Sequence, residues 1–387
     1  MNTQDVLFAL IRNVICGESI SEDVQQACTP EMLEYIYQIA SSHAIEHLVG
    51  HALSKIQMED SPALAKMKEV AVLTLYNQLQ LDFEYNRICQ VLQKAKIPFI
   101  PLKGTVLQKL YPEPWMRTRC DMDILVKEEQ LDVAAELLEN ELNYINKGRH
   151  DHDIAFRCPS GAYIELHYDT IQKRCETNNC RDVLAYVWED AQPVKTGSYE
   201  YNMSDEMFYF YHIAHMTKHF TAGGCGVRSF LDIWLMNHVE EFDRQKREDL
   251  LREGGLLKFA QAAESLGEFW FSNRKPEKMD EVFGAFILRG NRFGDRDNRA
   301  ALGQARNGGK VKYLLTRRVF MRYEFLKDEY PILKKHKWLT PAYQVVRWTR
   351  LFKGKFWKRV AKEISANVQV DKSAAASAAT LVEYLGL

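Results

Sequence analysis

Residues 97–126 read IPFIPLKGTVLQKLYPEPWMRTRCDMDILV, and this stretch decides the fold. Its first six residues form an apolar run of strand length, which Lys103 and Gly104 end. A short helix is predicted directly afterwards, over Thr105–Leu110. A strand that passes through a glycine into a helix N-terminus leaves backbone N–H groups unpaired, so this turn predicts a site for a phosphate group.

Two aspartates stand at the start of the next predicted strand, Asp121–Val126. Alternate side chains of an extended segment share a face, so Asp121 and Asp123 point the same way. Neighbouring carboxylates at the head of a buried strand repel each other unless a cation lies between them. The pair therefore predicts a divalent metal site, although acidic pairs also occur on solvated strand edges without a metal.

A second predicted strand, Tyr163–His167, supplies a third carboxylate. Its alternation places Glu165 and His167 on one face. A phosphoryl-transfer site with two metal ions needs bridging ligands and a further ligand or base near the attacking oxygen. Glu165 therefore completes a candidate two-metal site with Asp121 and Asp123.

These residues lie in a pattern that resembles a known family. The pattern consists of Leu-Lys-Gly at 102–104, Tyr-Pro at 111–112, Arg117 four residues before the first aspartate, and IELHYD at 164–169. It resembles a bacterial family of uncharacterised nucleotidyltransferases within the DNA polymerase beta-like superfamily. The resemblance extends loosely over most of the chain and is specific over residues 97–169.

The resemblance implies a polymerase beta-like core and an enzyme that moves a nucleoside monophosphate from a nucleoside triphosphate to an acceptor. It also implies two Mg²⁺ ions, with Mn²⁺ as the alternative ion. The superfamily uses small molecules, proteins and RNA as acceptors, and no residue here selects among them. The residues that match metal-binding and catalytic positions are Asp121, Asp123 and Glu165, and those expected at the nucleotide phosphates are Lys103, Gly104, Thr105, Arg117 and Arg119.

The sequence departs from the superfamily pattern at one point. Lys103-Gly104 stands where Gly-Ser is usual, so a hydroxyl that would help to hold the phosphates is missing. A degenerate nucleotide-binding or scaffold protein with the same fold is therefore the alternative function. Arg119 has two readings as well, because it could contact a phosphate or neutralise the acidic pair that follows it.

The expected fold class is α+β. We expect an N-terminal helical region over residues 1–60, the nucleotidyltransferase core over 61–195, and a helical, basic region over 196–387. A long helix is predicted from Ser61-Pro62 to Lys94, and its many apolar residues favour burial on more than one side. The strands of the predicted sheet are Ile97–Leu102, Asp121–Val126, Ile154–Arg157 and Tyr163–His167.

Histidines occur in two further clusters. The run HDHD at 150–153 is interpreted as a solvated strand start, with a metal or substrate contact as the alternatives. A helix capped by Ser204 carries His212, His215 and His219 on one face. This spacing seldom converges on one ion, so a domain contact is preferred to zinc, and a border of the active-site cleft is the third reading. The candidates for the acceptor side are His167, His215, His219 and Arg228.

Composition limits the remaining functions. With 46% hydrophobic and 27% charged residues and a net charge of −1, the chain is unlike a strongly basic, non-specific nucleic-acid binder. We expect a cytoplasmic protein, because no signal peptide, membrane-length apolar run or disulfide pattern is evident. The basic, aromatic segment Tyr343–Ala361 could contact an anionic partner, although packing on its own domain is the preferred reading.

Overall fold

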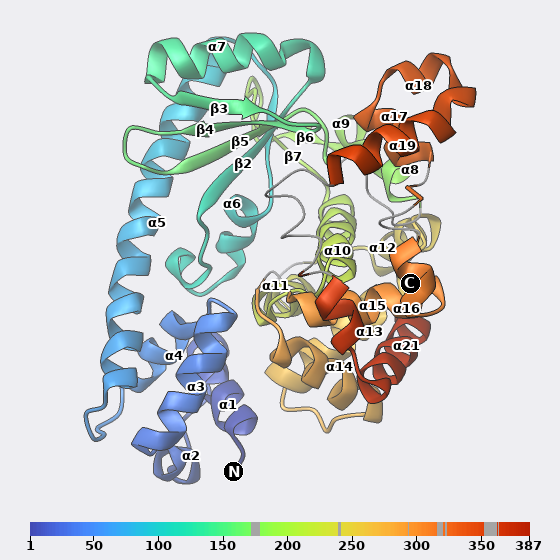
Figure 1. The fold of residues 1–387 in the computed structure, drawn as a ribbon. Coiled ribbons are helices and arrows are strands. Elements are labelled where there is room, and N and C mark those ends of the chain that lie inside the picture. The colour runs from blue at the N-terminus through green and yellow to red at the C-terminus, as the bar shows by residue number, and fades with distance from the viewer. Residues whose placement is uncertain are drawn as a thin grey trace.

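The computed structural model describes residues 1–171, 179–238, 241–292, 294–315, 320–321, 323–351, 362 and 364–387. It has an α+β architecture in which helices surround one five-stranded mixed sheet (Figure 1). The strand order is β1-β2-β5-β4-β3; β2 and β5 are parallel and the other neighbours antiparallel. The strands are β1 (Phe99–Pro101), β2 (Asp121–Val126), β3 (Ile145–Arg149), β4 (Asp153–Arg157) and β5 (Tyr163–His167), with a separate two-stranded sheet of β6 (Gln192–Pro193) and β7 (Tyr201–Asn202).

Four strands of the large sheet were expected from the sequence, and β3 was not. Most of the β3 side chains are exposed, so this edge strand lacks the apolar alternation that identifies a strand in a sequence. β4 and β5 form an antiparallel hairpin. It turns at Gly161, whose φ of +96° favours glycine.

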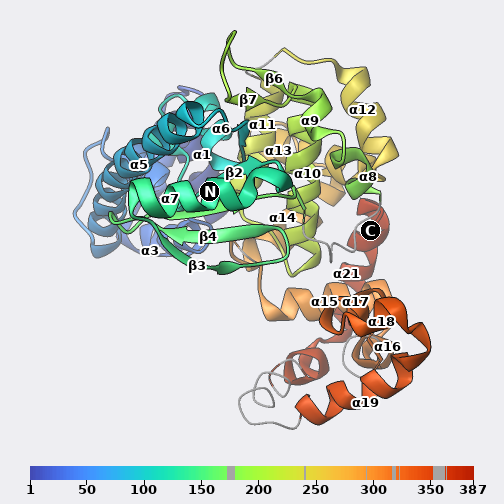
Figure 2. The ribbon, with the colours of Figure 1, turned by 90° about the horizontal axis from the view of Figure 1, so that it is seen from above.

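One face of the sheet carries its own hydrophobic core. Met122 and Ile124 of β2 pack there with Leu138 of α7 (Leu131–Leu142), which lies across the sheet (Figure 2). The C-terminal half of α5 (Pro62–Lys94) joins the same core through Ile88. This packing leaves the opposite face of β2, which carries Asp121 and Asp123, for the candidate site.

The N-terminal helices and the C-terminal helices share a second, larger core. Helices from both ends of the chain contribute to it, for example through Phe8 and Trp270, whose rings stack with centroids 4.7 Å apart. The N-terminal helices before α5 are α1 (Thr3–Ile15), α2 (Glu22–Ala27), α3 (Pro30–Ser42) and α4 (Glu46–Leu53).

The helices after the sheet form the right-hand side of Figure 1. Ser204 caps α10 as predicted, since its side chain accepts a hydrogen bond from the Met207 N–H. These helices are α8 (Cys180–Leu184), α9 (Val187–Asp190), α10 (Asp205–Thr221), α11 (Val227–His238), α12 (Arg244–Glu253), α13 (Leu257–Phe271), α14 (Lys278–Arg289), α15 (Arg296–Asn307), α16 (Lys310–Leu314), α17 (Tyr323–Glu329), α18 (Ile332–Lys335), α19 (Thr340–Leu351) and α21 (Lys372–Leu385).

The predicted bounds of the long helix α5 are confirmed, but its predicted burial on more than one side is wrong. Val72, Leu75 and Leu79, in the middle of the helix, are exposed. The reason is visible in Figure 1, where α5 runs from the N-terminal helices to the sheet, so its two ends pack on different cores. The middle of α5 spans the distance between them.

Two expectations concern the remainder of the chain. Within the described residues, no helix has both the length and the apolar character that a membrane crossing requires. Residues 352–361 of the basic segment Tyr343–Ala361 lie outside the described residues. The described part of this segment forms most of α19.

Burial of His47 predicts a specific pH dependence of stability. Its Nε2 lies 2.7 Å from the Met116 carbonyl oxygen, and burial lowers the pKa of His47 to about 4. Because the unfolded chain binds this proton more readily, with a pKa of about 6.5, the contribution of His47 to stability is complete above that pH. It is lost as the pH falls from about 6.5 towards 4.

We therefore expect the free energy of unfolding of wild type to exceed that of His47→Gln by the largest margin near pH 7. This margin should shrink as the pH falls. Denaturant titrations at several pH values measure this margin. A margin that stays constant between pH 7 and pH 4 would contradict the assignment.

Candidate active site

Four side chains meet where β2 and β5 run side by side. Asp123 stands opposite Glu165 in the parallel register. Lys103 Nζ lies 2.6 Å from Asp123 Oδ1 and 4.0 Å from Glu165 Oε2. His167 Nε2 lies 2.8 Å from the same Asp123 oxygen and 3.3 Å from Glu165 Oε2. One lysine and one histidine thus converge on two carboxylates.

The buried charges in this cluster stabilise one another. Burial alone would raise the pKa of Asp123, but Lys103 and His167 hold it below its usual range. Burial alone would lower the pKa of Lys103, and the Asp123 carboxylate reverses this shift. Asp121 behaves differently, because burial, followed by the charge of Asp123, raises its pKa to about 6. Glu165 adds to that increase, so Asp121 lies within the negative field of both carboxylates.

The turn at Lys103-Gly104 has a strained backbone and little space. Lys103 has a φ of +47°, which is uncommon for a residue with a side chain. A Cβ atom at Gly104 would lie 2.7 Å from Nη1 of Arg117 and 3.3 Å from Cβ of Arg119, so a larger residue would have to displace the Arg117 guanidinium. The following helix, α6, comprises only Gly104–Leu107 and gives way to a 3₁₀ turn. Its dipole is therefore smaller than the predicted helix Thr105–Leu110 would provide.

The two arginines expected at the phosphates have protein partners. Arg117 donates from Nε and Nη2 to the two carboxylate oxygens of Asp232, at 2.9 and 2.8 Å. Arg119 donates to Thr105 Oγ1 at 3.1 Å and to Asp82 Oδ1 at 2.5 Å. Arg119 thus pairs with Asp82 on α5, whereas the two readings from the sequence were a phosphate contact and the acidic pair that follows it. Through these contacts, both arginines fix the position of the loop that leads into β2.

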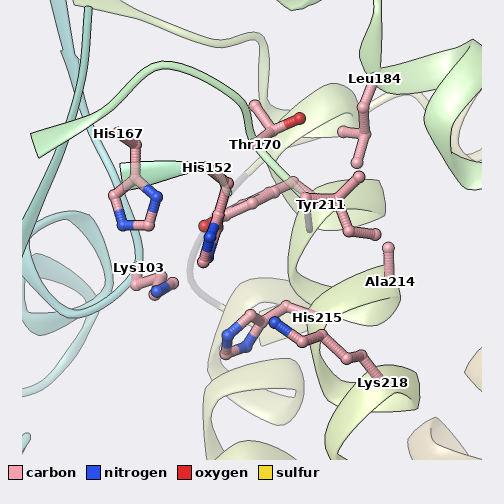
Figure 3. Close-up of a pocket in the computed structure, with 10 residues that line it drawn as sticks. Lys103, His152, His167, Thr170, Leu184, Tyr211, Ala214, His215 and Lys218 are labelled. Carbon is pink, nitrogen blue, oxygen red and sulfur yellow. The ribbon is translucent and has the colours of Figure 1, made fainter. Parts of the chain in front are cut away.

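Helix α10 forms the opposite wall of a pocket at this cluster (Figure 3). His215 lines the pocket, and its Nε2 lies 3.2 Å from Nε2 of His219. Burial lowers the pKa of both imidazoles, to about 4 for His219. His212 lies elsewhere, 4.0 Å from Asp232, so the three histidines of this helix do not meet at one point. The pocket is lined by Lys103, His152, His167, Thr170, Ile171, Leu184, Tyr211, Ala214, His215 and Lys218.

Arg228 of α11 holds the loop before β2. Its Nη1 donates to the carbonyl and the hydroxyl oxygen of Thr118, at 2.6 and 2.7 Å. Its charge acts on the site at longer range, because it lowers the pKa of Asp121 against the larger effects of burial and Asp123. Arg228 therefore contributes positive potential to the site while its hydrogen bonds fix the loop.

Two parts of the site were not expected from the sequence. The interpretation of residues 150–153 as a solvated strand start is wrong for His152 and Asp153, which are 8% and 3% exposed. β4 begins at Asp153, which stands opposite His167 of β5, and the His152 ring packs against the His167 ring at the pocket. Tyr211 was missed as well, although it lies four residues before His215 and therefore on the same face of α10.

The phenol of Tyr211 is a buried polar group in this pocket. Its hydroxyl has no hydrogen-bond partner among the described residues. Burial raises the pKa of Tyr211. The charge of Lys103 lowers this pKa, and the carboxylates of Asp123, Glu165 and Asp121 raise it. A hydroxyl with this environment can donate to a bound substrate without giving up a contact in the protein.

A family model described as an uncharacterised nucleotidyltransferase matches residues 30–272 of the chain. The match includes the whole sheet, the cluster around Asp123 and the helices α10 and α11. No curated protein and no solved structure matches the chain significantly.

Proposed function

The chain belongs to the uncharacterised nucleotidyltransferase family, and from this premise we propose a metal-dependent transfer of a nucleoside monophosphate from a nucleoside triphosphate. The acceptor oxygen attacks the α-phosphorus, a new P–O bond forms, and the bond to the β-phosphate breaks. Pyrophosphate leaves, and the proton of the acceptor hydroxyl passes to a base in the site.

One observation carries this proposal. Asp123 and Glu165 lie in register on parallel strands, beside Asp121, and a cation, Lys103 Nζ, lies 2.6 and 4.0 Å from their oxygens. A row of carboxylates at strand ends with a cation between them provides the electrostatics that a polyphosphate bound to metal ions requires.

The residues present fit divalent ions. Ligand atoms of Asp123, Glu165 and His167 lie within 4.8 Å of one another. Burial and then the charge of Asp123 raise the pKa of Asp121 to about 6, and a bound cation would favour its ionised form. Asp121, Asp123 and Glu165 would hold the ions, and bound Mg²⁺ would neutralise charge that develops on the phosphate oxygens.

The protein's own side chains have separate tasks in this proposal. Lys103 would contact the leaving phosphates once ions replace it between the carboxylates. Glu165, which is 36% exposed in its side chain, would accept the proton of the acceptor hydroxyl. Tyr211 and His215, on the opposite wall, would contact the acceptor or its phosphate.

The second candidate is a nucleotide-binding or scaffold protein without catalysis. The ion pair between Lys103 and Asp123 favours this candidate, because Lys103 neutralises Asp123 without a metal. In that case Lys103 would replace the metal permanently rather than move to a phosphate.

Labelled nucleotides separate the two candidates. Each of the four triphosphates, labelled at the α- or the γ-phosphate, is incubated with the protein, Mg²⁺ and fractions of a cell lysate. Transfer predicts an acceptor that acquires the α label and never the γ label, together with release of pyrophosphate. If no fraction acquires the α label while the protein still binds a triphosphate, the scaffold candidate holds.

Tyr211→Phe is expected to lower α-label transfer by about 10- to 100-fold, the effect of one lost hydrogen bond to a charged group. The melting temperature should stay the same or rise, because the substitution removes a buried hydroxyl that has no partner among the described residues.

The matched control is Tyr209→Phe, two residues earlier on α10. Its hydroxyl donates to the Glu264 carboxylate, so this variant should lose stability and keep its activity. Equal transfer by wild type and Tyr211→Phe would remove Tyr211 from the site.

A further inference from the structure

A second cluster of metal-ligating groups lies on the other side of His167. Ligand atoms of His152, Asp153 and His167 are within 4.8 Å of one another. Asp153 stands opposite His167 in the register of β4 and β5. The rings of His152 and His167 meet edge to face at the pocket, with centroids 5.2 Å apart (Figure 3).

The hydrogen bonds of His167 leave one ring nitrogen for a ligand. Its Nε2 lies 2.8 Å from Asp123 Oδ1 and 3.3 Å from Glu165 Oε2, and ionised carboxylates only accept hydrogen bonds. Nε2 therefore carries a proton and donates it, which fixes the orientation of the ring.

The other nitrogen, Nδ1, is buried and has no hydrogen-bond partner among the described residues, in a side chain that is 2% exposed. In Figure 3 this side of the ring faces His152. A histidine that donates from one nitrogen to a carboxylate commonly binds a metal ion through the other.

The neighbouring groups complete a donor set. Asp153 Oδ2 lies 3.0 Å from His152 Nδ1, and Asp153 Oδ1 lies 2.8 Å from His150 Nδ1. The Asp153 side chain is 4% exposed, so its carboxylate is held in a fixed position by two imidazoles. Two histidines and one carboxylate suit zinc and related transition-metal ions, whereas Mg²⁺ prefers oxygen ligands throughout.

We propose that His152, Asp153 and His167 bind a transition-metal dication, for which Zn²⁺ is the probe. This site adjoins the oxygen-rich site of Asp121, Asp123 and Glu165 through His167 Nε2 but uses none of those carboxylates as a ligand, and it does not depend on nucleotidyl transfer. Three protein ligands leave a fourth position, as in zinc sites that bind water or substrate. His152 and His167 both line the pocket, which Tyr211 and His215 line as well.

Metal titrations of the chelator-treated full chain test the proposal. Zn²⁺ affinity is measured by competition with a chromophoric chelator, and Co²⁺ is added as a spectroscopic probe of the ligand set. Wild type should bind one ion that raises the melting temperature and gives the absorption of four-coordinate cobalt. Loss of a group that only hydrogen-bonds to a metal ligand typically weakens metal binding by about 10- to 100-fold. His152→Ala and Asp153→Asn each remove a proposed ligand, so each should weaken Zn²⁺ binding by at least about 100-fold.

Two control variants make the result specific. His238→Ala removes an exposed histidine of α11 and should bind Zn²⁺ as wild type does. Asp121→Asn should also keep the Zn²⁺ site, whatever it does to Mg²⁺ and nucleotide. Cooperative melting of each metal-free variant shows that it has folded. If Asp153→Asn does not fold, the Zn²⁺ affinity of His152→Ala alone decides the result.

Several outcomes would overturn the proposal. Wild type and His152→Ala could bind Zn²⁺ equally, or Asp121→Asn alone could abolish binding, which would locate the ion at the carboxylates. X-ray absorption of the zinc-loaded wild type should detect two imidazole ligands, and a spectrum without imidazole would likewise reject the site.

Discussion

Glu165→Gln is expected to lower α-label transfer by about 10²- to 10⁴-fold, the usual contribution of a general acid–base group. The amide keeps the size of the side chain but cannot accept the acceptor's proton or serve as an ionised metal ligand. The fold should persist, because the Glu165 side chain is 36% exposed and its strand pairs on both sides.

Glu136→Gln, an exposed carboxylate on α7, provides the matched control and should keep full activity. Comparable transfer rates in Glu165→Gln and wild type would show that Glu165 does not take part in the reaction.

Asp232→Ala is expected to lower the free energy of unfolding by about 3–5 kcal/mol, the usual cost of removing one partner from a buried ion pair. Arg117 donates to both Asp232 oxygens, and the Tyr111 hydroxyl donates to one of them at 2.8 Å. Alanine would leave the guanidinium, 8% exposed, without its counter-charge. Chemical denaturation at pH 7 measures this loss.

The double variant Arg117→Met/Asp232→Leu separates charge from packing. Because both charges are gone, it should recover much of the lost stability. A loss below about 1 kcal/mol in Asp232→Ala would mean that this pair does not hold the loop before β2 against α11.

The local part of the fold and of the candidate site could be predicted from the sequence. Alternation placed Asp121 and Asp123 on one face of β2, and Glu165 and His167 on one face of β5. The parallel register then brings Asp123 beside Glu165. The start of α5 at Pro62 could be predicted because Ser61 is a strong N-cap, and its hydroxyl accepts from the Leu64 N–H.

Contacts between distant segments could not be predicted in this way. Arg117 was expected at a phosphate, but its partner Asp232 lies on α11, and no local pattern in either segment indicates the pairing. His152 is buried beside His167 at the pocket, and no local pattern around residues 150–153 indicates this contact. Tyr211 joins the site only because α10 packs opposite β5.

We propose above that the cluster around Asp123 binds a nucleoside triphosphate through divalent ions. Calorimetric titration of a triphosphate into wild type and Asp123→Asn, each with Mg²⁺ and with a chelator, tests it most directly. Asp132→Asn, an exposed residue on α7, is the control variant. We expect binding that requires Mg²⁺ in wild type and in the control and is lost in Asp123→Asn. Equal binding by wild type and Asp123→Asn, with or without Mg²⁺, would contradict it.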